Sequence, residues 1–262
     1  MAIFKKGVSH DYDVNMNIFF CDANGKLKSD ANMQKINDFR MLGISYLQNA
    51  EVVLAHLLGQ DPRNGDGESM ILPVLFNTWH GLELLLKCGN MICDEYLGIQ
   101  NQKYSKHTID VYADQFLEKM KRLGFKNLEK EEFVGVAEFV DDCKENNAHF
   151  DFARYTMQSN GQSQFYNTPD SNGVVPVVSL DMIEFAQVLM KINYNFVDVV
   201  DFLFDMLNRY GKGERRVINE SALKMYIEHE GCSRFVGDYD FENLEECAKK
   251  AKNNINCQIF DK

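Results

Sequence analysis

The sequence predicts a mainly α-helical protein, built as an up-and-down bundle of four to five long helices with a β-hairpin or long loop inserted before the last long helix. Two observations indicate this class. Apolar residues recur at three- and four-residue intervals over most of residues 30–211, which is the helical period. Between residues 146 and 179 this period is lost, and Gly, Pro, Asn and Ser become frequent.

Caps and breakers set the bounds of the expected helices. Asp30 and Asp181 are suited to cap helices, and Gly59, Gly98 and Gly211 to end them. The long helices are expected at 30–59, about 69–97, about 108–123, about 129–145 and 181 to about 210. The chain then divides into an N-terminal segment (1–29) with a hairpin signal, a helical domain (30–211) and a small C-terminal annex (212–262). The annex is expected to hold one short helix near 220–230 and a polar tail.

Composition excludes several classes of function. The chain has 262 residues and a net charge of -11, which argues against binding duplex nucleic acid through charge alone. No secretory leader and no long apolar run are visible, so we expect a cytoplasmic protein with no membrane contact. The seven cysteines are scattered without a C-x-x-C pair, which favours reduced packing residues over a structural zinc site. We expect neither a metal nor a cofactor.

The second expected helix is apolar on all sides but carries His80, Glu83 and Lys87 at helical spacing. Glu83 and Lys87 stand four residues apart in the favourable order for an ion pair. His107, before the next helix, and Arg154, in the inserted segment, are placed to join them. Two interpretations follow: a polar pocket for a phosphate, nucleotide or carboxylate, or a structural network in which each charge satisfies the others. The structural interpretation is favoured.

Three segments, taken in order, resemble the HEPN-like helical bundles of bacteria and archaea. A central helix with Glu and Lys four residues apart is matched by PVLFNTWHGLELLLKCGNM. A loop with His that opens the next helix is matched by KYSKHTIDVYADQF, and a Phe-Arg-Tyr-Pro element by HFDFARYTMQSNG. The resemblance implies the fold, frequent dimerisation and a setting in nucleic-acid or defence biology. Ribonuclease members carry an Arg followed four to six residues later by a His. Here only Lys144 and His149 imitate that spacing, so an intact nuclease site is not implied.

Three functions remain open. The first is a non-catalytic binding protein, a homodimer whose partner is RNA, a nucleotide or a protein. The second is a divergent metal-independent ribonuclease that uses His149 with Lys144 or Arg154. The third is a scaffold whose polar cluster is purely structural. Two further patterns receive their simpler interpretation: the Asp198, Asp201 and Asp205 stripe as a solvated helix face rather than a cation site, and the aromatic residues as core.

Overall fold

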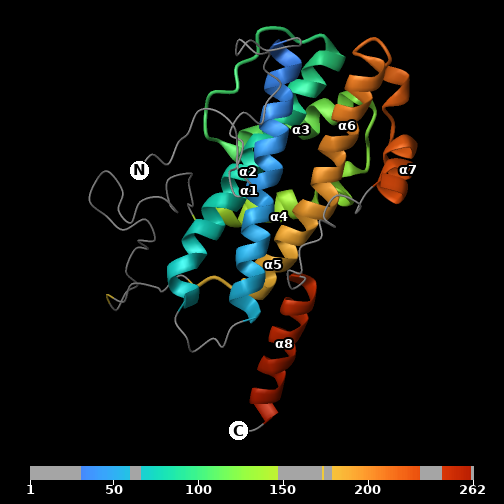
Figure 1. Cartoon of the computed structure of the whole chain (residues 1–262). Helices are drawn as coiled ribbons and strands as arrows, with labels where there is room; N and C mark the ends of the chain where they lie inside the picture. The colour runs from blue at the N-terminus through green and yellow to red at the C-terminus, as the bar shows by residue number, and fades with distance from the viewer. Residues whose placement is uncertain (1–30, 60–65, 147–172, 174–178, 231–243, 261–262) are drawn as a thin grey trace, which may run out of the picture.

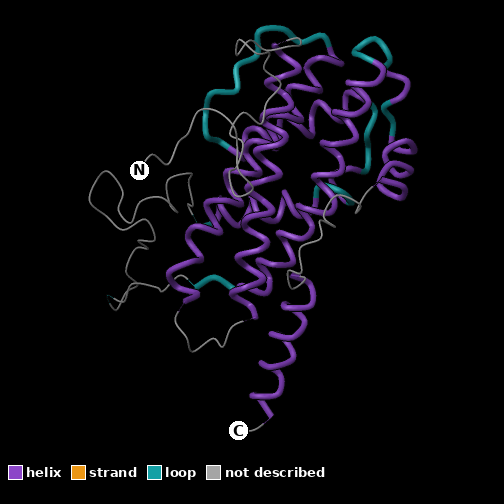
Figure 2. Tube along the Cα trace, viewed as in Figure 1, coloured by secondary structure: helices purple, strands orange, loops and turns teal. Residues whose placement is uncertain are grey.

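The computed structural model describes residues 31–59, 66–146, 173, 179–230 and 244–260, and these residues form a helical bundle without a strand (Figures 1 and 2). The long helices α1, α2 and the α5–α6 pair lie alongside one another, with α3 and α4 packed against them and α7 on the flank. The elements are α1 (Ala31–Gly59), α2 (Asp66–Leu97), α3 (Ile109–Leu123), α4 (Val134–Glu145), α5 (Met182–Lys191), α6 (Val197–Tyr210), α7 (Glu220–Glu230) and α8 (Leu244–Phe260).

The α2 helix is the centre of the bundle. Every residue from Gly81 to Asp94 is buried, as its apolar composition predicts. Two glycines let α1 approach it closely: a Cβ added at Gly81 would lie 2.9 Å from the carbonyl oxygen of Gly43, and one at Gly43 would lie 3.0 Å from that of Gly81. This contact brings the two backbones together along the helix that carries the polar residues.

The predicted helix from Asp181 to Tyr210 is present but contains a change of winding. Its N-terminus is capped as predicted, because the Asp181 carboxylate accepts hydrogen bonds from the backbone N–H groups of Ile183 (2.9 Å) and Glu184 (3.1 Å). Residues Ile192–Phe196 then form a π-helical turn between α5 and α6. The α4 helix packs against this point, where a Cβ on Gly135 would lie 2.9 Å from the backbone nitrogen of Ile192.

The start of the fourth helix and the structure of the C-terminal region differ from the prediction. The fourth helix begins at Val134 rather than near Glu129, because Leu128 and Phe133 both turn into the core and the N–H of Phe133 bonds to the carbonyl of Leu128 at 2.9 Å. The C-terminal region forms a further helix, α8, where a polar tail was predicted. Its polar composition hides a short apolar stripe that packs on α1 and α5: Leu244, Cys247 and Ala248.

The other sequence predictions have mixed outcomes. Helices α1, α2, α3 and α7 confirm the expected elements to within a few residues. The inserted hairpin or long loop receives no support, since most of it, like the whole N-terminal segment, lies outside the described residues. Trp79 and Phe116 are buried, which confirms their assignment to the core. The cysteines that the structure describes are buried, and burial raises the pKa of the Cys93 thiol to about 12.

Candidate functional site

A stripe of four buried polar residues runs along α2: Glu83, Lys87, Asn90 and Asp94. Their spacing of four, three and four residues keeps them on one face of the helix, which turns once in 3.6 residues. The face is covered by α3 and by the loop of residues 98–108. We call this set the α2 polar stripe. Its two ends are built differently.

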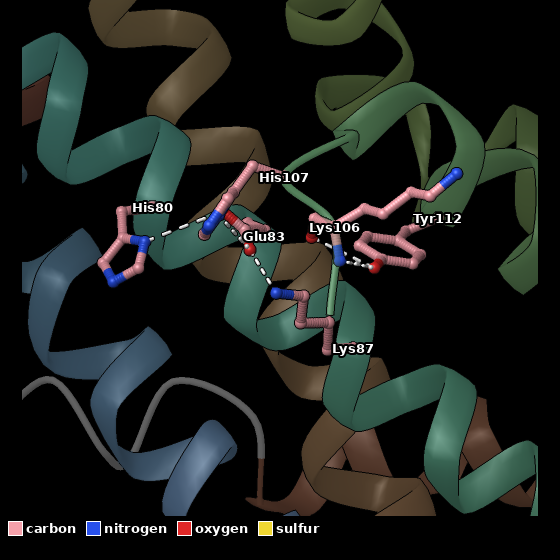
Figure 3. A network of polar contacts seen from close by, with 6 residues as sticks. All are labelled: His80, Glu83, Lys87, Lys106, His107 and Tyr112. Carbon is pink, nitrogen blue, oxygen red and sulfur yellow. Dashed lines mark hydrogen bonds and ion pairs between the residues drawn. The ribbon is translucent and has the colours of Figure 1, made fainter. Parts of the chain in front are cut away.

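At the first end, the carboxylate of Glu83 is the centre of a cluster (Figure 3). Its side chain is fully buried and forms an ion pair with the ammonium group of Lys87. The Nδ1 atom of His107 lies 3.1 Å from both carboxylate oxygens, and the Nδ1 atom of His80 lies 3.7 Å from Oε2. We call these four residues the Glu83 cluster.

The partners of Glu83 hold it in its ionised form. Burial alone would raise the pKa of this carboxyl, but the interactions with His80, Lys87 and His107 outweigh burial and lower the pKa to about 2. An ionised carboxylate can only accept hydrogen bonds, so the Nδ1 atom of His107 must carry a proton. The contacts with Glu83 use Nδ1, so Nε2 lies on the side of the ring that does not contact Glu83.

Aromatic contacts and exposure distinguish the two histidines from the buried ion pair. The His80 ring lies edge-on to Tyr46 with centroids 4.7 Å apart, and it stacks on Phe76 at 5.6 Å. Its side chain is 22% exposed and that of His107 is 53% exposed, whereas Lys87 is only 7% exposed. The cluster thus reaches solvent through its imidazoles, and the Glu83–Lys87 ion pair lies buried behind them.

The loop that carries His107 is fixed to α3. The hydroxyl of Tyr112 donates to the carbonyl oxygen of Lys106 (3.0 Å) and accepts from its N–H (3.1 Å) (Figure 3). Both bonds use the backbone of Lys106, and its side chain is exposed, as is that of Lys103. The stretch from residue 97 to residue 109 contains no acidic residue, so this loop is locally positive in an acidic protein.

At the other end of the stripe, Asp94 forms a closed network with Tyr104 and Lys119. The Lys119 ammonium lies 2.7 Å from Asp94 Oδ1 and donates to the Tyr104 hydroxyl at 2.6 Å, and that hydroxyl donates in turn to Asp94. Burial and then the Asp94 carboxylate raise the pKa of Tyr104, so the phenol stays protonated. All three residues are buried, which indicates a structural brace.

The structure tests the predicted site residues unevenly. It brings His80, Glu83, Lys87 and His107 together, while Lys144 lies exposed at the end of α4. Two other predicted residues, His149 and Arg154, lie outside the described residues. The prediction missed Asn90, Asp94, Tyr104 and Lys119. Asn90 and Asp94 continue the spacing of Glu83 and Lys87 along α2, so that signal was available in the sequence.

The aspartates of α6 correct another prediction. Asp198 and Asp201 are buried rather than solvated. For Asp201 the reason is a cation from α1: Arg40 pairs with it, and the guanidinium lies 4.9 Å from the centre of the Phe204 ring. Asp205 accepts a hydrogen bond from Tyr226 at 2.8 Å. Among the described residues, no group of three or more His, Cys, Asp or Glu side chains is placed to hold a metal ion.

Comparisons with protein-family models, with curated proteins and with solved structures found no match for this chain. The HEPN-like resemblance therefore rests on the sequence motifs alone. Within the part of the chain that the structure describes, no helix is both long and apolar enough to cross a membrane.

Proposed function

We propose that this chain is a HEPN-like binding protein without an intact ribonuclease motif, and that it recognises a phosphate group of RNA or of a nucleotide at the exposed imidazoles of the Glu83 cluster. The observation that carries the proposal is one buried carboxylate that orients two partly exposed histidines. A structural brace alone needs no exposed imidazoles, as the closed network at Asp94 demonstrates.

The charge balance of the cluster favours an anionic ligand. Lys87 already neutralises Glu83, so the buried pair adds no net negative charge that would repel an anion. Lys103 and Lys106 add two exposed positive charges on the same loop as His107. Phosphate oxygens accept charge-assisted hydrogen bonds from such groups. The phosphate would meet His107 and Lys106 and would leave Lys87 buried.

Fluorescence anisotropy with a labelled single-stranded RNA octamer tests the proposal. We expect binding that weakens with salt, and that weakens at least fivefold in His107→Ala and in Lys106→Ala proteins. His229→Ala and Lys130→Ala, which remove exposed residues of the same types elsewhere, should bind as the unchanged protein does. Equal affinity in all five proteins would refute the assignment of this site.

A ribonuclease is the second candidate, because a carboxylate that holds a histidine through Nδ1 is also an arrangement for proton transfer. Incubation of the same RNA with the protein in EDTA, followed by gel separation, detects metal-independent cleavage. Cleavage lost in His149→Ala would support the His149 site with Lys144 or Arg154, and cleavage lost only in His107→Ala would place the chemistry at the Glu83 cluster. RNA that stays intact in the presence of the unchanged protein would support binding without catalysis.

The HEPN-like resemblance also suggests a homodimer that acts in bacterial defence or stress, with a protein as an alternative partner. Sedimentation equilibrium measures the first point directly. A mass near twice 30.2 kDa would support the dimer, and a mass of one chain would refute it.

A further inference from the structure

An open cleft lies beside the closed end of the α2 polar stripe. It is bounded by the end of α2, by Asn32 at the start of α1 and by the loop of residues 99–104, and it holds about 330 Å³. That volume is within the range of small-molecule sites. The depression between Phe125 and Leu223 has only about 10 Å³, enough for roughly one water molecule.

Uncharged amides dominate the wall of this cleft. Asn32, Gln100, Asn101 and Gln102 each bring one hydrogen-bond acceptor and an NH₂ donor group. Glu95 contributes the carboxylate, which contacts the amide of Asn32 and lies 3.5 Å from the ammonium of Lys212. The second carboxylate on the wall, Asp94, is already committed to Lys119 and Tyr104.

The backbone shapes the cleft before any ligand arrives. Gly98 ends α2 with a φ of 69°, and Asn101 has a φ of 61°, a left-handed conformation that Asn tolerates better than most residues. The N–H of Ile99 bonds to the carbonyl of Asp94 at 3.0 Å. Tyr104 then anchors the far end of this loop in the buried network with Lys119. The amide side chains of Gln100, Asn101 and Gln102 are therefore carried by a loop that is held at both ends.

We propose that this cleft binds a nucleobase of single-stranded RNA, with guanine preferred. A carboxylate such as Glu95 accepts two hydrogen bonds from the ring N–H and the amino group of guanine, and the amides can bond to its remaining polar atoms. The same carboxylate repels phosphate, which would lie toward Lys103, Lys106 and His107 farther along the loop. This inference rests on the proposed function, because it assigns the base while the Glu83 cluster takes the phosphate.

The test compares RNA octamers of uridine that carry one central guanine, inosine or adenine. Inosine lacks the amino group of guanine, so it removes one of the two bonds to Glu95. We expect the guanine octamer to bind about tenfold more tightly than the other two, which is the usual effect of one good base contact. Glu95→Gln and Gln102→Ala should abolish this preference, so that each variant binds the guanine, inosine and adenine octamers with the same affinity.

The outcomes separate the two proposals. Binding of all octamers with equal affinity would overturn the base site and leave the phosphate site standing. If no octamer binds, the proposed function fails, and guanosine is then titrated while the side-chain amide signals of Asn and Gln are followed by NMR. If guanosine shifts these signals in the unchanged protein but not in Gln102→Ala, the base site is supported. If the signals do not move in the unchanged protein, the base site is overturned. Thermal unfolding of each variant checks that its fold is unchanged.

Discussion

The two ends of the α2 polar stripe contain the same kind of ion pair but differ in how far their other members reach solvent. Each end buries a carboxylate against a lysine: Glu83 with Lys87, and Asp94 with Lys119. At Asp94 the third partner is a buried tyrosine, and each of the three residues is only 6–8% exposed. At Glu83 the additional partners are histidines, and one of them is 53% exposed.

This difference separates a brace from a candidate site. A buried ion pair is weak evidence for function, because its charges can exist only to satisfy one another. An ion pair that also orients exposed imidazoles presents protonatable groups to solvent. The four predictions below test whether the two ends differ in this way, and they are ordered by the size of the expected effect on stability.

The largest loss is expected at the closed end. Lys119→Met leaves the buried Asp94 carboxylate with the Tyr104 hydroxyl but without its cation. Breaking a buried pair in this manner costs about 4 kcal/mol. Urea unfolding followed by circular dichroism measures the change, and a loss below about 1 kcal/mol would show that this network is not a brace.

Glu83→Gln should lower the free energy of unfolding by about 3 kcal/mol at pH 7, because the pKa of Glu83 falls from 4.5 to about 2 on folding. A lowered carboxyl pKa stabilises the fold above the ordinary pKa, and this stabilisation is lost as the pH falls from about 4.5 to 2. The free energy of unfolding, measured by urea at several pH values in this range, should therefore change less with pH for Glu83→Gln than for the unchanged protein. The same pH dependence in both proteins would contradict the assignment.

Lys87→Met should cost less than Lys119→Met, about 2 kcal/mol, because the Glu83 carboxylate keeps contacts with two imidazoles when the ammonium is removed. The Nδ1 atom of His107 lies 3.1 Å from Glu83, and that of His80 lies 3.7 Å from it. Urea unfolding of Lys87→Met, His107→Ala and the double variant measures this compensation, and His107→Ala should cost more in the double variant than it does alone. Equal costs would mean that the histidine does not compensate.

The smallest effect is expected at Glu51 on α1, a carboxylate with no cation beside it among the described residues. Asn193 and Tyr194 donate to it at 2.7 and 3.2 Å, but burial raises its pKa, so its charge destabilises the fold once the pH exceeds 4.5. Glu51→Gln keeps an acceptor and removes the charge. We expect a gain of less than about 1 kcal/mol at pH 7, and a loss above 2 kcal/mol would contradict this.

Much of the fold was predictable because helical spacing and caps are local signals. Asp181 caps α5 as expected, and α2 is buried as its apolar composition indicates. The π-turn at Ile192–Phe196 and the pairing of Asp201 with Arg40 were not predictable. Both depend on which helices meet, α4 at Gly135 and α1 at Arg40, and spacing within one helix does not contain that information.

The candidate site was predictable where its residues share one helix. It was missed where the contacts depend on how two helices pack. Glu83, Lys87 and His80 lie on one helix, and their contacts follow from helical geometry. His107 was expected near this cluster because it lies two residues before the first residue of α3, and it contacts Glu83. Lys119 was missed because it lies between Glu118 and Lys121 in a charged stretch of α3 that is typical of a solvated face. Only the pairing of α2 with α3 explains why this lysine is buried.

The most direct test of the central claim, that the Glu83 cluster is a ligand site and not a brace, is a long-range ¹H–¹⁵N NMR spectrum of the histidine rings during titration with the RNA octamer. We predict that the Nε2 signals of His80 and His107 shift with added RNA, while the signal of His229 does not. His80 and His107 signals that stay unmoved while RNA binds elsewhere would contradict the claim and leave the Glu83 cluster as a second structural brace.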